Sequence, residues 1–235
     1  MAISLANGLK SLSLVLCCLM VGTIIYTISI DGLPFRKDLL TLWMASLVLD
    51  CFINAVPLAA WVLYKETNSI AVIVWIILLV CFGSITTCAY IFIQFLKLSP
   101  EESAQDPIYH VLLHYENKNV LEQKRKHSPV LVARITFSIL GWLMLGTWIY
   151  TISTDGSFLH KEFYTPWMVA TLVDFYMINV IVLSVWVAYK ESSWLSAFLW
   201  ITSFICLGSV CTCAYIVKQL MQFTSQDPLY LVLLN

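Results

Sequence analysis

The sequence predicts an all-α integral membrane protein with six transmembrane helices, arranged as two tandem three-helix modules in inverted topology. Three observations predict it: an apolar composition, six membrane-length apolar segments, and an internal repeat. Of the 235 residues, 60% are hydrophobic and 11% are charged, whereas soluble domains average about 45–50% and about 25%. The net charge of −1 gives no electrostatic reason to expect nucleic acid. The expected surrounding is the lipid bilayer.

Six segments reach the length of about 20 apolar residues that a spanning helix needs. They cover residues 12–30, 39–64, 70–96, 132–154, 164–189 and 194–217. Lipid offers the backbone no hydrogen-bond partners, so segments of this length without period-two alternation are expected to be helices. The first segment lies where a signal peptide would. Its counterpart lies in the middle of the chain, however, so both are expected to span.

The first three segments recur as the last three. YTISIDG, ending at Gly32, returns as YTISTDG, ending at Gly156, and CFGSITTCAY, from Cys81, returns as CLGSVCTCAY, from Cys206. We therefore expect a first three-helix module over residues 1–98 and a second over residues 130–235, which ends in an interfacial segment. A polar linker with a short interfacial helix is expected between them, over residues 99–129. Three crossings in each module would invert the second copy, as in many secondary transporters.

Basic residues near the helix ends predict the orientation, because cytoplasmic loops carry an excess of Lys and Arg. With six spans, one side holds nine: Arg36, Lys37, Lys97, Lys118, Lys124, Arg125, Lys126, Arg134 and Lys190. The other side holds four: Lys10, Lys65, Lys161 and Lys218. This favours a cytosolic linker with both termini on the far side, in an endomembrane or the plasma membrane.

Two acids lie near the middle of apolar segments and are the first candidates for function. Asp50 and Asp174 each follow about a dozen residues of their helix, close to the membrane midplane. Acids at this depth are costly and are functional hypotheses by default. If the two carboxyls approach each other, they predict a site for a proton or small cation. The alternative is a carboxyl that bonds to a neighbouring helix and serves packing.

Two asparagines follow these acids and join them as polar midplane candidates. Asn54 lies four residues after Asp50 and shares its helix face. Asn179 lies five residues after Asp174, so it reaches the same face only if the second copy contains a π-bulge or a local shift.

For several other repeated residues we expect a structural role. Asp31 and Asp155 end the first helix of each module and precede a glycine, which suits helix capping, with a gating or ligand role as the alternative. The four repeated tryptophans are expected in an aromatic belt, and the YKE ends of the second helices are expected as anchors at the interface. The tryptophans are Trp43, Trp61, Trp167 and Trp186. The paired Gly-Ser steps at 83–84 and 208–209 are expected to bring helices into close contact.

No cofactor, metal or catalytic chemistry is expected. His110 and His114 have a spacing that suits a shared metal, but the repeat replaces them by Leu231 and Asn235, and two ligands are too few. The sequence lacks the Walker, Rossmann, GxSxG and HExxH motifs, so we do not expect an enzyme.

The duplicated YTIS-x-DG motif, the intramembrane acids and the WV-x-YKE ending together resemble a plant family of uncharacterised multi-pass membrane proteins, domain of unknown function 1475. The resemblance covers the whole chain. It implies a plant membrane protein and no established activity.

The leading functional hypothesis is a transporter or channel-like protein whose pathway passes Asp50 and Asp174. A structural or accessory protein that scaffolds a larger membrane complex is the alternative. An integral enzyme acting on lipid or isoprenoid substrates is the least supported class.

Overall fold

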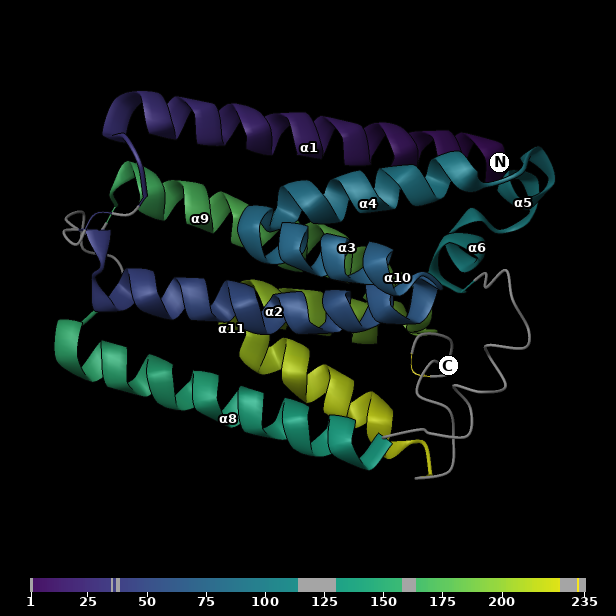
Figure 1. Cartoon of the computed structure of the whole chain (residues 1–235). Coiled ribbons are helices and arrows are strands. Elements are labelled where there is room, and N and C mark those ends of the chain that lie inside the picture. The colour runs from purple at the N-terminus through teal and green to yellow at the C-terminus, as the bar shows by residue number, and fades with distance from the viewer. Residues whose placement is uncertain are drawn as a thin grey trace.

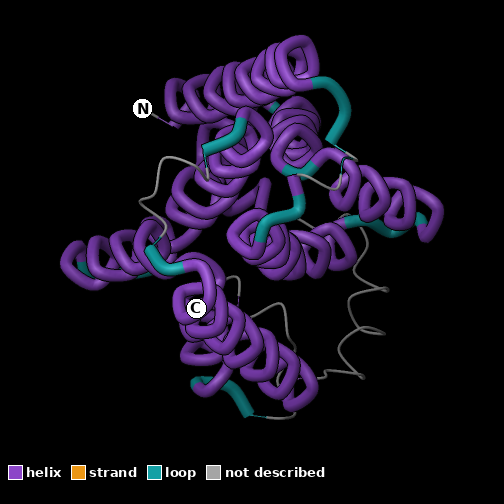
Figure 2. The backbone as a smooth tube through the Cα atoms, turned by 90° about the vertical axis from the view of Figure 1, so that its left-hand side faces the viewer, coloured by secondary structure: helices purple, strands orange, loops and turns teal. Residues whose placement is uncertain are grey.

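A computed structural model describes residues 2–34, 36, 39–113, 130–157, 164–224 and 232. These residues form helices joined by short connections, without strands among them (Figure 1). Figure 2 looks along the bundle and shows the helices grouped around one another. The expected all-helical class is confirmed for the described part of the chain.

The first half consists of two long helices followed by four shorter ones. The long helices are α1 (Ala2–Asp31) and α2 (Leu42–Lys65), and the shorter ones are α3 (Ser69–Phe82), α4 (Ser84–Lys97), α5 (Pro100–Gln105) and α6 (Pro107–Leu113). Gly32 follows α1 with a φ of 71°, and its N–H bonds to the Ile28 carbonyl. The expected glycine cap is therefore confirmed. Asp106 accepts from the Tyr109 N–H at the start of α6, the cap that its position before a proline predicts.

The described part of the second half repeats the two long helices and the segment that follows them, with one irregularity. It contains α8 (Val130–Asp155), α9 (Pro166–Tyr176), the π-helix η3 (Met177–Leu183), α10 (Ser184–Lys190) and α11 (Trp194–Met221). The π-helix lies where the second copy carries one extra residue. It absorbs that residue without ending the helix, so the expected π-bulge is confirmed.

The third helix of each half folds back on itself at a glycine. Gly83 separates α3 from α4, and Gly208 interrupts α11, both with positive φ. Trp75 and Tyr90 are fifteen residues apart, yet their ring centroids lie 4.9 Å from each other. In a straight helix, two residues fifteen positions apart are separated by about 22 Å along the axis. Trp200 and Tyr215 repeat this contact at 5.0 Å. Each third segment is therefore a helical hairpin.

The hairpins change the topology that the sequence predicts. The Thr86 hydroxyl donates to the Leu78 carbonyl across the first hairpin, so α4 returns towards the end from which α3 came. Figure 1 shows α1 and α8 running in the same direction, so both helices begin at the same end of the bundle. We call this end the terminal end. A module of two crossings and a hairpin does not invert its copy, so the inverted arrangement is not confirmed.

Five helices in the described ranges are long and apolar enough to cross a membrane, by length and composition. Four of them are α1, α2, α8 and the continuous run of α9, η3 and α10. The fifth is α11, which reaches this length only if both arms of its hairpin are counted together. The expected third span is divided into two 14-residue helices. Each extends about 21 Å, less than the hydrocarbon core of about 30 Å. Six spans are therefore not confirmed.

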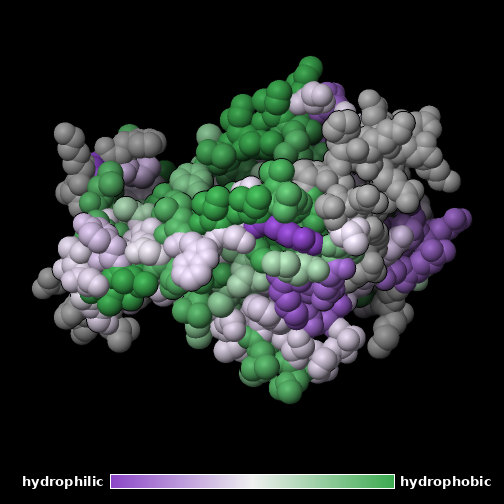
Figure 3. Space-filling model, turned by 90° about the horizontal axis from the view of Figure 1, so that it is seen from below, coloured by the Kyte–Doolittle hydropathy of each residue, from purple (hydrophilic) through white to green (hydrophobic). Residues whose placement is uncertain are grey.

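Apolar side chains cover much of the outside of the bundle. Val15 and Ile25 on α1 and Ile139 and Trp142 on α8 are at least half exposed. Figure 3 shows apolar residues over much of one face and polar residues gathered towards one end. Such a surface is typical of a protein whose solvent is lipid.

Three of the tryptophans do not lie in an aromatic belt. Trp43, Trp61 and Trp167 are buried, each at most 9% exposed. The Trp61 indole N–H donates to the Leu112 carbonyl, and that of Trp167 donates to the Gly32 carbonyl. The belt prediction is wrong for these residues because all three indoles are buried in the bundle, and those of Trp61 and Trp167 bind carbonyls of distant segments.

Candidate functional site

Asp50 of the first half caps the hairpin of the second half. Asp50 lies in the middle of α2 and is 1% exposed. Its Oδ1 atom accepts from the Ser209 N–H at 2.8 Å, directly after the break at Gly208. The N–H groups of a first helical turn have no partner within the helix, and the turn carries the positive end of the helix dipole. A carboxylate is therefore well suited to this place.

Asp174 makes the reciprocal contact. It lies near the end of α9, and its Oδ1 atom accepts from the Ser84 N–H at 2.8 Å and from the Ser84 hydroxyl at 2.5 Å. Ser84 begins α4, directly after the break at Gly83. Each half thus supplies the acid that caps the other half's hairpin.

Glycine is required at both breaks for two reasons. Gly83 has φ 50° and ψ −119°, and Gly208 has φ 51° and ψ −132°. Side chains other than hydrogen rarely allow such backbone angles. A Cβ atom on Gly83 would also lie 2.5 Å from Asp174 Oδ2. A Cβ atom on Gly208 would overlap the Asp50 carboxylate and lie 2.9 Å from Phe175 Cζ.

The two acids do not hydrogen-bond to each other. Each carboxylate is bound to a different hairpin tip, and both tips lie inside the bundle. The arrangement holds two anionic acceptors against two helix N-termini. It can fix the hairpins while the carboxylates are charged, and it can release backbone donors when a carboxylate is neutralised.

The structure describes the side chain of one asparagine candidate, Asn54, but not that of the other, Asn179. Asn54 is buried beside Asp50, and its amide donates to the Asp50 carbonyl at 3.0 Å and to Oδ1 at 3.4 Å. It therefore shares the helix face of Asp50, as its spacing predicts. Asn179 lies within η3, but its side chain is outside the described residues.

The secondary candidates lie at the end of the bundle opposite the terminal end, away from the hairpin tips. Asp31 is the last residue of α1 and pairs with Arg36 at 2.5 Å. Asp155 is the last residue of α8 and precedes the positive-φ Gly156. Neither belongs to the central acid site.

Two further acids hold the hairpins at the terminal end, and sequence reasoning assigned them only an anchoring role. Glu66 accepts from the Tyr90 hydroxyl at 3.0 Å and from the Gln94 amide at 3.2 Å. Its counterpart Glu191 accepts from the Gln219 amide at 3.3 Å. The signal in the sequence that could have identified this role is the repeated Gln, which lies ten residues after the serine of each Gly-Ser step.

The electrostatics of Glu191 favour its charged form. Burial by itself raises the pKa of this carboxyl, but the hydrogen bond from Ser196 and the nearby Lys218 and Lys190 lower it below its ordinary value. Glu191 therefore stays ionised at neutral pH and holds the second hairpin by charge-assisted bonds.

The two repeated lysines bind backbone carbonyls. Lys65 Nζ donates to the carbonyls of His110 and Val111, at 2.9 and 2.7 Å, and Lys190 Nζ donates to the carbonyl of Val232. Val111 and Val232 are equivalent in the repeat. The lysines thus tie the segment that follows each hairpin back to the second helix of the same half.

Within the described ranges, no group of three or more His, Cys, Asp or Glu side chains is arranged to hold a metal ion. His110 lies 3.8 Å from Glu102, and His114 lies outside the described residues.

Replacing either break glycine by alanine should destabilise the protein strongly. We expect a loss of about 1–3 kcal/mol from the backbone conformation alone, plus the cost of displacing Asp174 for Gly83→Ala or Asp50 for Gly208→Ala. Unfolding of the purified protein in mixed micelles of increasing denaturing detergent measures this loss.

The matched controls are Gly22→Ala and Gly146→Ala, because both glycines are helical and a Cβ there would meet nothing within 4 Å. Alanine favours a helix interior by about 1 kcal/mol over glycine, so these variants should be at least as stable as the native protein. Equal stability of all four variants would contradict the hairpin geometry.

Comparison with known proteins agrees with the resemblance read from the motifs. A family model described as "Protein of unknown function (DUF1475)" matches residues 8–119 and 121–235. No curated protein and no solved structure matches the chain. Because the matched residues cover nearly the whole sequence, the chain belongs to the DUF1475 family of proteins of unknown function.

Proposed function

We propose that this protein is a multi-pass membrane transporter or channel-like protein with a central acidic site formed by Asp50 and Asp174. The observation that carries the proposal is the pair of carboxylates, Asp50 buried and Asp174 part-buried, at the tips of two hairpins in an apolar bundle. Broken helices at membrane depth are tolerated where protein or a cavity surrounds them, and transporters use them for ion and substrate sites.

The membrane arrangement that we propose has four full crossings and two hairpins that enter from the terminal end and return to it. The basic residues support it. Among the Lys and Arg residues that the structure describes, Arg36 lies at the other end and six lie at the terminal end: Lys10, Lys65, Lys97, Arg134, Lys190 and Lys218. This asymmetry exceeds the one expected for six spans, and it favours a cytosolic terminal end. The membrane is an endomembrane or the plasma membrane, and the family resemblance favours a plant protein.

The proposed transported species is a proton or a small cation. A proton on Asp174 would remove the negative charge that faces the α4 N-terminus and would weaken the bonds from Ser84. A small cation would compete with the hairpin tip for the same carboxylate oxygens. Either event favours a state in which the tip has moved, so binding at the acid is linked to a change in the bundle.

The alternative function is a structural or accessory membrane protein. It is favoured by the bonds of Asp50, Asp174, Glu66 and Glu191, each of which holds helices together. In that case the acids serve assembly. A partner would then co-purify in a fixed ratio in mild detergent. Substitutions of the Asp residues would alter that ratio, and neither the native protein nor the variants would transport ions.

Flux through the purified full chain tests the central acidic site. The protein is placed in vesicles that contain a pH-sensitive dye, and a pH step with or without a potassium gradient is applied. We expect proton or potassium-linked flux above that of protein-free vesicles. Asp50→Asn together with Asp174→Asn should abolish most of it, because asparagine keeps an oxygen acceptor for the tip N–H but carries no charge.

Asp31→Asn is the control, since Asp31 lies away from the tips, and its flux should match the native protein. Unchanged flux in the double variant would remove the acids from the mechanism. Flux no greater than that of empty vesicles for native protein would overturn the transport proposal.

A topology experiment tests the proposed crossings separately. Tags at the N-terminus, in the linker and at the C-terminus should all be modified from the same side of sealed vesicles. Labelling of the linker from the side opposite to the termini would instead require three crossings in each half.

A further inference from the structure

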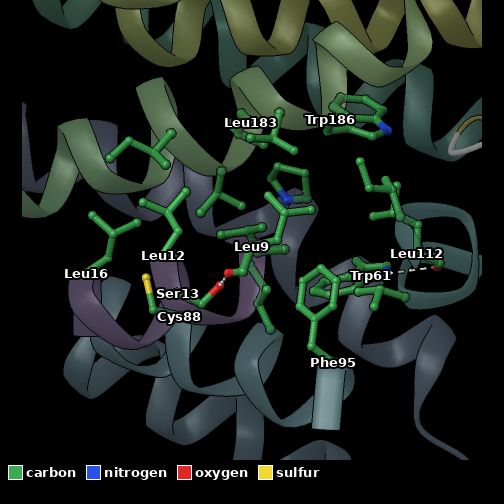
Figure 4. A pocket seen from close by; sticks show the side chains of 18 residues that line it. Leu9, Leu12, Ser13, Leu16, Trp61, Cys88, Phe95, Leu112, Leu183 and Trp186 are labelled. Atoms are coloured by element: carbon green, nitrogen blue, oxygen red, sulfur yellow. Dashed lines mark hydrogen bonds between the residues drawn. The ribbon is translucent and has the colours of Figure 1, made fainter. Parts of the chain in front are cut away.

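An apolar pocket lies between the two halves, close to the terminal end of the bundle (Figure 4). In Figure 4, Leu183 and Trp186 of the second half form one wall, and Leu9, Trp61 and Phe95 of the first half form the opposite side. The cavity volume is about 130 Å³. An engineered apolar cavity of roughly 150 Å³ stays dry and binds benzene, so this pocket has room for a hydrocarbon group.

The repeat builds a second pocket of the same kind. It has a volume of about 120 Å³ and also contains Pro57, Trp61 and Trp186 in its wall. Six of its seven remaining wall residues correspond through the repeat to residues of the first pocket: Ala60 to Val185, Ala133 to Leu9, Phe137 to Ser13, Ile216 to Ile91, Leu220 to Phe95 and Val232 to Val111; Tyr64 is the exception. Because equivalent positions form both pockets, the cavity is a property of the duplicated fold.

The polar groups of the first pocket's first-half wall are engaged with the protein. The Ser13 hydroxyl donates to the Leu9 carbonyl, and the Trp61 N–H donates to the Leu112 carbonyl. An occupant of this wall therefore gains little from hydrogen bonds and much from apolar contact. Water is a poor occupant, because it needs two to four polar partners.

The helices on the two sides of the pocket both depart from regular α-helical geometry. Pro57 lies inside α2, and the pocket residues Ile181 to Leu183 belong to the π-helix η3. A proline removes one backbone hydrogen bond from its helix, and π-bulges occur frequently at functional sites. The two irregularities face the same cavity from opposite halves.

The pocket is continuous with the apolar outside of the bundle. Leu12 lines the pocket and is 40% exposed, and Val15 beside it on α1 is 59% exposed. At the other side the pocket approaches the charged end of α2, where Lys65 follows Trp61 by one helical turn. A chain that enters beside α1 would therefore keep its polar end near the charged ends of the helices.

We propose that the two pockets bind acyl chains of bilayer phospholipids between the halves of the repeat, with the chain against Trp61 and Trp186. This site is separate from the acids at the hairpin tips. A bound acyl chain would stabilise the contact between the halves, because it buries apolar area and makes dispersion contacts with both walls of the pocket.

Quenching of tryptophan fluorescence by brominated phosphatidylcholine tests this site, because bromine quenches an indole only at short range. Trp61 is 7% exposed, so bulk lipid does not reach it except through the pocket. The full chain and its Trp61→Phe variant are placed in vesicles of normal or brominated lipid. We expect the native protein to contain a quenched component that Trp61→Phe lacks.

Trp43→Phe provides the matched control, since Trp43 is equally buried at 6% exposure and lines neither pocket. The emission that this variant removes should be the same in both lipids. Ser13→Phe should reduce the quenching of Trp61 without abolishing it, because the phenyl ring narrows the first pocket while the second pocket, which also contains Trp61, stays open.

Emission from Trp61 that is equally intense in normal and brominated vesicles would overturn the proposal. So would equal quenching of Trp43 and Trp61, which would indicate general lipid penetration. Neither result depends on whether the protein transports ions, so the test is independent of the proposed function.

Discussion

The fold depends on how two helix N-termini are satisfied inside an apolar bundle. A helix that begins within the bundle exposes backbone N–H groups that neither lipid nor apolar side chains can bind. Asp50 and Asp174 supply the acceptors, and the helix dipole offsets part of the cost of their burial. The hairpins, the glycine breaks and the close contact between the halves all follow from this requirement.

The reciprocity of the two contacts joins the halves. The acid on the second helix of one half caps the hairpin of the other, so neither half satisfies its own tip. At the terminal end, Glu66 and Glu191 instead hold the hairpin of their own half. The base of each hairpin is therefore fixed within its half, while the tip is sensitive to the relative position of the two halves and to the charge on one carboxylate.

Much of the fold could be predicted from the sequence where the signals are local. The helical segments, the glycine caps after Asp31 and Asp155 and the π-helix in the second copy follow from length, composition and residue spacing. The acids themselves were also identified as the central candidates. These features depend on neighbours within a few residues, which periodicity and turn chemistry describe well.

The hairpins could not be predicted in this way, because their cause lies outside the segment. A Gly-Ser step in an apolar run of membrane length resembles a site of close helix packing. The acid that stabilises each break is distant in the sequence: Asp174 lies 90 residues from Ser84, and Asp50 lies 159 residues from Ser209. The same limit explains the tryptophans: an indole near a helix end suits an aromatic belt, and only tertiary contacts show that Trp61 and Trp167 bond to distant carbonyls.

The most direct test of the account is a double-mutant cycle between Ser84 and Asp174, which lie in different halves. Stability is measured for Ser84→Ala, Asp174→Ala and the double variant in mixed micelles of increasing denaturing detergent. The bond between the Ser84 hydroxyl and a charged carboxylate predicts a coupling free energy of about 1.5–3 kcal/mol. Additive effects, within about 0.5 kcal/mol, would contradict the claim that one half's acid holds the other half's hairpin.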